Sequence, residues 1–576
     1  MTSINKEKIV RTEHLENANS AGGILNSEDE FIDTHPHDDE LFEQAKLGTE
    51  DEHSLTLKDA IKYHMPAILW SMLFSATIIM EGYDNSLIGS FYAYPSFARK
   101  YGSYNAVSGD YQLSGPWQVG LGCASAAGSI VGVICNGYMT EKWGHRHVIL
   151  VSLIIMAACI FITFFAQNVG TLVAGQVLSG LPWGVFATVG SQFSSEVVPL
   201  KLRGYLAAYI NICWATGQLI AAGVLQGFIN YGNDDITGKG QWSYRIPFAL
   251  QWMFIPPLFI LTWLAPDSPQ WLIRKGKIDA AYKSLKRLSN HKIHDKIPSR
   301  LAMMRHTNNL EKQAHNDLKD ETALQGFKKC FQGVNLRRTE IGCFAFSAQV
   351  LSGSTFAYSP SYFFSQAGLA SGDTYKLNLG VTGIAWVGTT LSWVLLSRFG
   401  RRTIFLTGYT LLVIMLLLIG ILACPTQTSG IKWAQAGITM VWVAVYSLTI
   451  GPGAFIFSVE ASSTILRPQS VALARGYYTL WSLISNIVEP YLINPGNANL
   501  KGKTAFVWLG TAVCIWVWAV FRLPETKDRT YEELDILFNK QVPAWKFSSY
   551  KIDVVTETPA LQEKYEAEAA QEEQSE

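Results

Sequence analysis

Twelve apolar segments, each about long enough to cross a lipid bilayer, dominate the hydropathy pattern of the chain. A membrane-spanning helix needs about 20 predominantly apolar residues. A long polar stretch separates the first six segments from the last six. The expected spans are residues 66–90, 117–138, 147–167, 170–192, 204–227, 247–265, 340–364, 378–398, 403–423, 433–457, 470–493 and 504–523. The pattern predicts an all-α membrane protein with 12 transmembrane helices in two six-helix halves.

Three sequence features recur in both halves, in the same order and at separations of 256, 264 and 258 residues. The pairs are Gly144-His-Arg and Gly400-Arg-Arg, Glu196…Arg203 and Glu460…Arg467, and the segments that begin at Pro266 (PDSPQWL) and Pro524 (PETKDRT). Such duplication is common in transporters, where the substrate site lies near the bilayer midplane between the repeats. The repeats therefore favour a secondary transporter over a fixed pore.

Charge is distributed unevenly, although the chain has 46 basic and 46 acidic residues. Residues 1–60 carry a net charge of −10 and residues 551–576 a net charge of −6, so the remainder carries +16. Most basic loop residues follow even-numbered spans, and the central polar stretch holds 16 Lys and Arg. Because cytoplasmic loops carry the excess of Lys and Arg, these loops and both termini are expected in the cytoplasm.

These features divide the chain into five segments. The acidic, apolar-poor tails bury too little surface to offset the entropy of ordering, which favours disorder. The central stretch contains amphipathic segments such as residues 277–288, which predict short helices along the cytoplasmic face. The expected organisation is an acidic disordered tail (1–65), an N-terminal six-helix half (66–265), a cytoplasmic linker with short helices (266–339), a C-terminal six-helix half (340–524) and a cytoplasmic tail (525–576).

Several motifs carry a resemblance to a known family. Residues 195–204 (SEVVPLKLRG), 266–272 (PDSPQWL) and 524–527 (PETK) resemble motifs of the sugar porter family of the major facilitator superfamily. Residues 80–84 (MEGYD), 244–252 (YRIPFALQW) and 534–538 (LDILF) are similar to the fungal maltose and α-glucoside permease branch. The resemblance implies the major facilitator fold and a proton-coupled secondary transporter that imports α-glucoside disaccharides of the maltose type by alternating access at the plasma membrane.

Two carboxylates in the first span are candidates for proton coupling. Glu81 and Asp84 are three residues apart and share nearly one helix face. An ionisable residue inside a span costs roughly 2.5–3.5 kcal/mol and usually has a function. The resemblance implies a proton-coupling role for Asp84. Arg475 is a candidate counter-charge, with snorkelling to the cytoplasmic interface as the alternative.

Amide, hydroxyl and aromatic side chains in the spans are candidates for a sugar site, since a sugar offers hydroxyls and an apolar ring face. Asn211 and Gln218 are seven residues apart and lie on one helix face. The resemblance places these two residues, Gln349 and Thr355 at sugar-binding positions. Further candidates are Tyr358, Phe455, Tyr478 and Asn486. The alternatives are helix–helix contacts for the amides and lipid-facing packing for the tyrosines.

Charged residues at the cytoplasmic helix ends form a candidate gate. A Glu at one helix end and Arg residues in facing loops can form charge-assisted bridges where the halves meet. The alternative is that these charges only set topology. The candidate cytoplasmic gate residues are Glu141, Arg146, Glu196, Arg203, Arg401, Glu460 and Arg467.

Other functions fit less well. A proton-independent facilitator would not need the two acids of the first span, and sugar-sensing relatives tend to have longer cytoplasmic tails. Another oligosaccharide or hexose transporter of the same family remains an alternative. The sequence contains no nucleophile–base arrangement or phosphate loop, so an enzyme is not expected. We expect no cofactor and no metal. The expected partners are a disaccharide, protons and the lipid bilayer, without nucleic acid, for a monomer.

Overall fold

The computed structural model of the 576-residue chain describes most of its length. The described residues are 43–45, 47–48, 51, 55–105, 110–231, 241–317, 327–357, 365, 371–426, 428–462, 466–494, 497–527, 529 and 531–550. The disorder expected of residues 551–576 and of most of residues 1–65 falls outside them. Within the expected N-terminal tail, however, Leu57–Tyr63 form a helix whose Ala60 is buried, so the expectation of disorder is wrong there.

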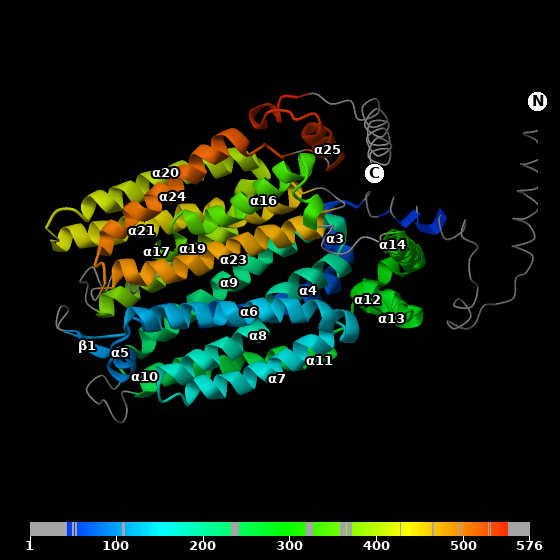
Figure 1. Ribbon diagram of the computed structural model, residues 1–576. Coiled ribbons are helices and arrows are strands. Elements are labelled where there is room, and N and C mark those ends of the chain that lie inside the picture. The colour runs from blue at the N-terminus through cyan, green and yellow to red at the C-terminus, as the bar shows by residue number, and fades with distance from the viewer. Residues whose placement is uncertain are drawn as a thin grey trace, which may run out of the picture.

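Long helices form one elongated bundle, with small elements at each end (Figure 1). The N-terminal half contains α3 (Leu57–Tyr63), α4 (Met65–Phe91), α5 (Pro95–Tyr101), β1 (Ser103–Asn105), β2 (Asp110–Gln112), α6 (Gly115–Trp143), α7 (His145–Phe164), α8 (Val169–Val197), α9 (Leu200–Phe228), α10 (Trp242–Ala249), η3 (Leu250–Phe254) and α11 (Ile255–Leu264). The antiparallel pair β1–β2 was not expected from the sequence. It lies in the loop between the first two spans.

The second half repeats this arrangement without strands among its described residues. It contains α16 (Gly333–Leu351), α17 (Ser354–Ala357), α19 (Ser371–Arg398), α20 (Arg401–Leu422), α21 (Ser429–Leu448), α22 (Ile450–Glu460), α23 (Arg467–Ile493), η6 (Lys501–Lys503) and α24 (Thr504–Arg522). The expected short linker helices are confirmed as α12 (Pro269–Arg274), α13 (Ile278–Leu288), η4 (His291–Lys296) and α14 (Ile297–Asp317). The tail adds α25 (Tyr531–Asn539) and η7 (Ala544–Lys546).

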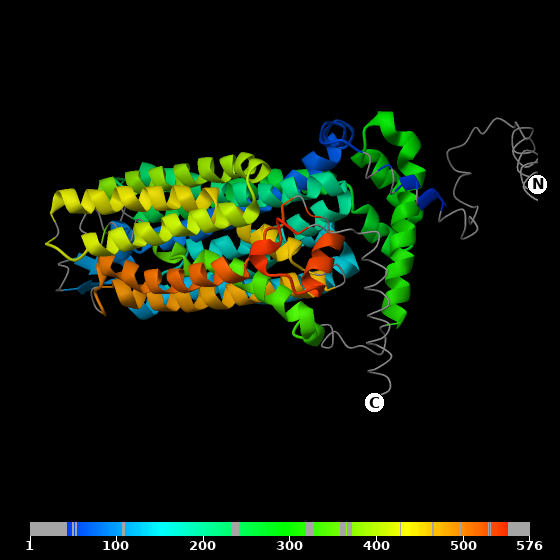
Figure 2. The same cartoon turned by 90° about the horizontal axis from the view of Figure 1, so that it is seen from above.

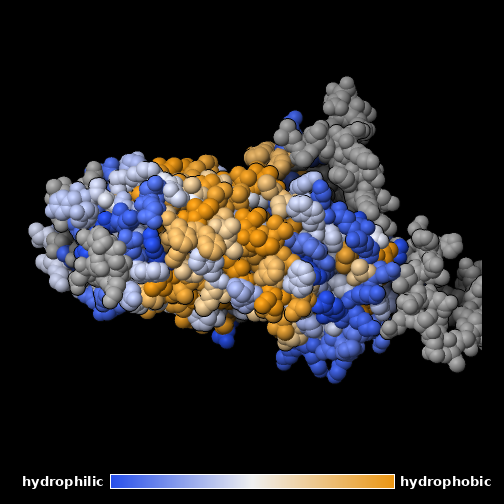
Figure 3. All heavy atoms as spheres, turned by 90° about the horizontal axis from the view of Figure 1, so that it is seen from below, coloured by the Kyte–Doolittle hydropathy of each residue, from blue (hydrophilic) through white to orange (hydrophobic). Residues whose placement is uncertain are grey.

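The two ends of the bundle differ. One end, here called the α14 end, bears α3, the linker helices and α25, whereas the opposite β1 end bears β1, α5 and α10 (Figure 1). Seen from above, α14 lies across the end of the bundle (Figure 2). On the face shown in Figure 3, hydrophobic residues form a band across the middle, with hydrophilic residues at both ends. This surface is the one that a bilayer-spanning bundle requires.

Each half has its own apolar interior. One set of buried side chains comes from α16 to α25, and two others come mainly from α4 to α11. The halves meet where α9 packs on α19 and α23 packs on α6. Within the N-terminal half, α6 and α8 approach so closely that a Cβ at Gly128 would lie 2.0 Å from the Val177 carbonyl oxygen. The glycine is therefore required for this close approach of the two helices.

Among the described residues, nine helical segments are long and apolar enough to cross a membrane. The other three expected spans, α9, α16 and α23, are helices of 29, 19 and 27 residues. These three helices carry most of the residues expected to bind sugar, including Gln218, Gln349 and Tyr478. Such polar side chains are typical of helices that face the interior of a bundle or a water-filled cavity.

Candidate functional site

Asp84 lies inside α4 with a defined set of polar neighbours. Its side chain is only 2% exposed, and Gln251 Nε2 donates a hydrogen bond of 2.7 Å to Asp84 Oδ1. Gln176 and Trp183 of α8 lie beside the same carboxylate. Gln251 belongs to η3, the short 3-10 segment between α10 and α11. The break in the sixth span therefore brings an amide to Asp84.

Close helix packing holds the acidic face of α4 in place. A Cβ at Gly82 would lie 2.2 Å from the Trp214 carbonyl oxygen of α9, and one at Gly217 would lie 2.1 Å from the Ile79 carbonyl oxygen. Neither position has room for a larger side chain unless the backbone moves. Because Gly82 lies between the two acids, its contact with α9 fixes their position relative to the helix that carries Asn211 and Gln218.

Glu81 faces the other half of the molecule. Its carboxylate interacts electrostatically with Arg475 of α23 and with Asp84. The Arg475 guanidinium lies 5.6 Å from the ring centroids of both Phe346 and Tyr478. The structure therefore brings together all three residues expected to couple protons, with Arg475 beside Glu81 and an amide beside Asp84.

The remaining sugar-site candidates of α9 and α23 lie near the junction of the halves. Asn211 is half-buried, and Gln218 is buried. Trp386 of α19 donates from Nε1 to Thr216 Oγ1 at 2.9 Å, which joins the halves next to Gln218. Asn486 of α23 is half-buried, and its Cβ lies 3.8 Å from where a Cβ at Gly122 of α6 would be.

Two candidates on the seventh span contact protein groups. Gln349 Nε2 donates to the Gly451 carbonyl oxygen at 2.7 Å, next to the break between α21 and α22. The Thr355 hydroxyl hydrogen-bonds the Ser485 hydroxyl of α23. Both side chains thus make the helix–helix contacts that were the alternative to sugar binding. Tyr358 and the side chain of Phe455 lie outside the described part of the chain.

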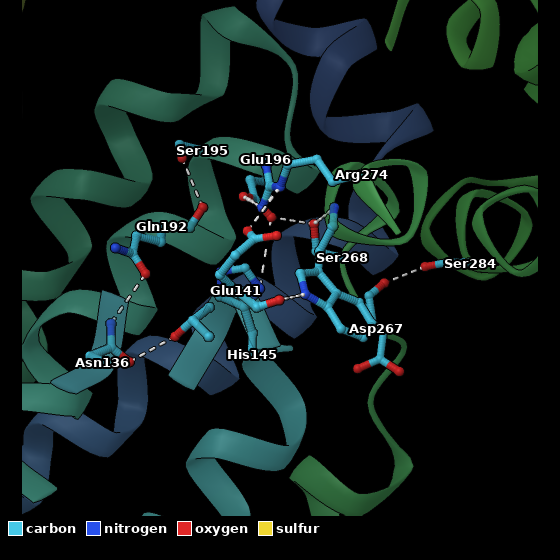
Figure 4. Close-up of polar contacts among 12 residues, drawn as sticks. Asn136, Glu141, His145, Gln192, Ser195, Glu196, Asp267, Ser268, Arg274 and Ser284 are labelled. Carbon is cyan, nitrogen blue, oxygen red and sulfur yellow. Dashed lines mark hydrogen bonds and ion pairs between the residues drawn. The ribbon is translucent and has the colours of Figure 1, made fainter. Parts of the chain in front are cut away.

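Glu196, at the end of α8, is the centre of a polar cluster at the α14 end (Figure 4). Arg274 Nη2 donates to Glu196 Oε1 at 2.9 Å, and the Ser268 hydroxyl donates to Glu196 Oε2. Arg274 Nε also lies 3.4 Å from Glu141 Oε2, and Lys275 Nζ lies 3.1 Å from Glu141 Oε1. Residues of the linker therefore bind two of the three acids expected in the cytoplasmic gate.

The C-terminal half repeats this cluster with different residues. The Thr526 hydroxyl donates to Glu460 Oε2, and Arg401 Nη2 lies 3.8 Å from Glu460 Oε1. Burial raises the pKa of Glu460, an effect that Thr526 and Arg401 oppose. Glu525 accepts hydrogen bonds from the backbone N–H groups of Arg401 and Arg402 at 2.8 and 3.2 Å, at the N-terminus of α20. A carboxylate is stabilised there by the free N–H groups and the helix dipole.

The bonds just described join residues within one half and its adjoining linker, rather than residues of opposite halves. Arg203 Nε donates to the Val198 carbonyl oxygen at 3.3 Å, and the Arg146 guanidinium lies 5.6 Å from the Trp263 ring centroid. The side chain of Arg467 lies outside the described part of the chain. Of the expected gate residues, Glu141 and Glu196 thus lie in one cluster and Arg401 and Glu460 in a similar one, whereas Arg146 and Arg203 make other contacts.

Hydrogen bonds between the halves gather at the β1 end. Tyr375 Oη donates to the Ser90 carbonyl oxygen at 2.5 Å, and Asn378 Nδ2 lies 3.4 Å from Ser90 Oγ. Asn494 Nδ2 donates to the Leu113 carbonyl oxygen at 3.3 Å. These contacts hold α4 to α19 and α23 to the start of α6, so the halves are joined at this end.

Three polar residues that bind buried or clustered side chains in the structure were not predicted from the sequence: Gln251, Arg274 and Glu489. Gln251 and Arg274 belong to recognisable motifs, but their partners Asp84 and Glu196 are distant in sequence. Glu489 of α23 is 6% exposed and accepts a 2.6 Å hydrogen bond from Trp508 Nε1. An acid within the expected span 470–493 was the signal that could have identified it.

Comparisons with known proteins agree with this architecture. The family described as "Sugar (and other) transporter" matches residues 70–538. The chain is 36% identical to a maltose permease of Saccharomyces cerevisiae over 519 residues, which are 89% of this chain and 82% of that protein. It is 35% identical to a general alpha-glucoside permease of Saccharomyces cerevisiae over 551 residues, which are 95% of this chain and 87% of the relative.

Solved structures share the fold. The xylose transporter XylE from E. coli, in a partially occluded inward open conformation, has a TM-score of 0.63 at 18% identity and covers 81% of this chain and 100% of its own. The major facilitator proton:xylose symporter XylE bound to 6-bromo-6-deoxy-D-glucose has a TM-score of 0.62 at 18% identity, covering 83% and 99% of the two chains. The chain therefore has the major facilitator fold and belongs to the sugar transporter family, a family of multi-pass membrane transporters rather than enzymes.

Proposed function

We propose that the protein imports α-glucoside disaccharides of the maltose type together with protons, by alternating access across the plasma membrane. The observation that carries the proposal is the cluster of Glu81, Asp84 and Arg475 between the halves, in a chain whose relatives include a maltose permease and a general alpha-glucoside permease. A proton-independent facilitator would not need buried carboxylates that are costly inside a membrane.

The charges of α4 and α23 support a route for coupling. A proton that enters Glu81 removes its negative charge and with it the attraction to Arg475 on the opposite half. Asp84 instead has an amide partner, Gln251, which can hydrogen-bond the carboxyl group in either protonation state. We propose that Asp84 carries the proton and that Glu81 and Arg475 link its charge to the position of the two halves.

Sugar is proposed to bind between the halves, next to this cluster. Asn211 and Gln218 of α9 and Asn486 of α23 offer amides, and Tyr478 stacks against Arg475 and can support a sugar ring. Gln349, Thr355, Tyr358 and Phe455 complete the proposed site. An amide already bound to the protein, such as that of Gln349, retains its side-chain carbonyl oxygen as an acceptor for a sugar hydroxyl.

Alternating access requires one end to close as the other opens. In the conformation described, the hydrogen bonds of Ser90, Tyr375 and Asn494 join the halves at the β1 end. The acid–base clusters at the α14 end instead lie within each half. We propose that Glu141, Arg146, Glu196, Arg203, Arg401, Glu460 and Arg467 form a cytoplasmic gate that re-pairs when the β1 end opens.

Orientation follows from the excess of basic residues at the α14 end, which is proposed to face the cytoplasm together with both termini. The proposed division is a tail (1–65), two six-helix halves (66–265 and 340–524), a cytoplasmic linker (266–339) and a tail (525–576). The partners are a disaccharide, protons and the surrounding lipid, without nucleic acid, and the transporter is proposed to act as a monomer.

The test is a panel of sugars in a host that lacks other sugar permeases, with the pH of a weakly buffered medium recorded. We expect uptake of at least one of maltose, turanose, trehalose and sucrose, transient alkalinisation of the medium, and collapse of uptake when a protonophore is added. Uptake that is insensitive to the protonophore would contradict proton coupling. Failure on all four sugars would contradict the substrate class.

A further inference from the structure

A cavity of about 710 Å³ opens beside the first transmembrane helix at the α14 end. One wall is α13, and another is the segment that runs into η4. Pro66, in the first turn of α4, lies on the membrane side of the cavity. The lining residues are Pro66, Lys283, Lys286, Arg287, Ser289, Asn290, His291 and His294.

The charge of this cavity is of one sign. Lys283, Lys286 and Arg287 line it together with two histidines, and none of its lining residues is acidic. The walls are held by the backbone, because Asn290 N donates to the Tyr63 carbonyl oxygen of α3 at 2.9 Å. The cavity is thus a fixed cationic pocket, which favours an anionic occupant.

One lining side chain has an unused hydrogen-bonding atom. His294 Nε2 is buried and has no hydrogen-bond partner among the described residues. The ring centroids of His294 and His291 are 4.6 Å apart. A bound anion placed between the two rings could accept a hydrogen bond from an N–H of each.

Apolar surface adjoins the cationic pocket on its membrane side. On α4, Leu69 is 59% exposed and follows Pro66 by three residues, so both lie on one helix face. On α11, which packs against α4, Leu264 is 54% exposed. Arg287 Nη2 donates to the Leu264 carbonyl oxygen at 2.6 Å, which ties the basic helix to this apolar surface. A ligand that satisfies both surfaces has a charged head and an apolar tail.

We propose that an anionic phospholipid of the cytoplasmic leaflet binds here, with its phosphate groups among Lys283, Lys286, Arg287 and the two histidines and its acyl chains along α4 and α11. Basic pockets at the cytoplasmic side of membrane helices bind such headgroups. The lipid would bridge the linker and the N-terminal half, and so hold α13 against α4. The proposal rests on the proposed function only in placing the α14 end in the cytoplasm.

The test compares lipid binding by the full-length wild type and a double variant, Lys283→Ala with Lys286→Ala. The purified proteins are placed in nanodiscs of phosphatidylcholine alone or doped with phosphatidylinositol bisphosphate, and retained lipid is measured by native mass spectrometry. The matched control is Lys142→Ala with Lys328→Ala, which removes two exposed lysines elsewhere. We expect the pocket variant to bind the anionic lipid about 30-fold more weakly and the control to bind it as the wild type does.

Three outcomes of this experiment would overturn the proposal. Equal binding by the pocket variant and the wild type would overturn it, as would equal losses in both variants, since any surface lysines would then suffice. Displacement of the lipid by soluble inositol trisphosphate at the same concentration would overturn it too, because the acyl chains would contribute nothing. Lipid retention is measured without sugar, so failure here leaves transport untouched. Sugar uptake by both variants reports that they are folded.

Discussion

The two halves are alike at the α14 end and unlike in the middle of the bundle. At that end, Ser268 and Thr526 occupy corresponding positions after the sixth and twelfth spans and donate to the corresponding acids Glu196 and Glu460. In the middle, the N-terminal half carries Asp84 with an amide partner. Duplication has thus retained the contacts that hold each half together, whereas the chemistry between the halves has diverged.

The divergence extends to how buried acids are used. Asp84 has several polar neighbours and lies near Glu81, which in turn interacts with a cation of the other half. Glu489 of the C-terminal half has one described partner, the Trp508 indole of its own half. A group that couples protons to motion must exchange interactions as the halves move. Of these three acids, Glu81 is the one whose described partners include a charge of the other half, which favours the acids of α4 for the proposed role.

The largest expected effect separates these two acids. Asp84→Asn should abolish sugar-driven alkalinisation of the medium, because the amide cannot take up a proton at this site. Glu489→Gln should preserve it, since the amide oxygen can still accept from Trp508. The measurement is a pH-electrode trace during sugar addition, with Asp373→Asn, an exposed acid, as the control. Loss of the signal in Glu489→Gln would show that both halves carry protons.

The next effect concerns the contact between the halves. Arg475→Gln removes the charge that interacts with Glu81 and should reduce proton-coupled uptake about 10-fold, the loss expected if this charge interaction contributes roughly 1.4 kcal/mol to coupling. Arg475→Lys keeps the charge and should retain part of the activity. Initial rates of radiolabelled sugar uptake measure both. Full coupled uptake in Arg475→Gln would mean that this arginine is an interfacial charge only.

A smaller effect tests the likeness of the two clusters at the α14 end. Glu196→Gln should lower thermal stability more than Glu460→Gln, by about 2 against about 1 kcal/mol, because Glu196 is bound closely by Arg274 whereas Arg401 lies farther from Glu460. The midpoint of thermal unfolding in detergent measures both, with Asp373→Asn as the reference. Equal shifts would indicate that the clusters are energetically equivalent despite their different geometry.

The last effect concerns the attachment of the linker to the N-terminal half. Arg300 Nη1 lies 3.1 Å from His64 Nδ1, and burial and then Arg300 lower the pKa of His64 to about 3. The folded state therefore favours neutral imidazole, so this contribution is complete above about pH 6.5 and is lost as the pH falls toward 3. Between pH 6.5 and 5 we expect a loss of up to about 2 kcal/mol in the wild type.

The control for this pH effect is His64→Gln, which removes the titrating group. Thermal midpoints measured from pH 7 to pH 5 should decline more in the wild type than in the variant. Parallel curves would show that protonation of His64 does not oppose folding.

Hydropathy predicted the spans well because each needs only a local run of apolar residues. The helices extend past several predicted ends, as where α6 continues through residues 139–143, which include Glu141 and Lys142. What the sequence could not supply were pairings set by the packing of distant helices, such as Gln251 with Asp84 and Arg274 with Glu196. The roles of the site residues themselves stay predictions.

The C-terminal tail is a second case in which contacts between distant residues could not be predicted from the sequence. Its acidic outer part led to an expectation of disorder, yet Leu537 and Phe538 of α25 belong to the apolar interior of the C-terminal half. Four apolar residues in a nine-residue helix are too short a signal to reveal where that helix docks, because their partners on α16 are distant in sequence.

The docking of α25 sets where this protein can be shortened or fused to a reporter. Arg337 Nη1 donates to the Val542 carbonyl oxygen at 3.0 Å, and Arg529 Nη2 donates to the Tyr550 carbonyl oxygen at 2.6 Å. Removal of residues 531–550 would uncover the part of α16 that α25 packs on and leave two guanidinium groups without these acceptors. We expect cellular quality control to degrade such a destabilised chain before it reaches the membrane. A fluorescent protein joined after Tyr550 would leave the whole packed segment intact.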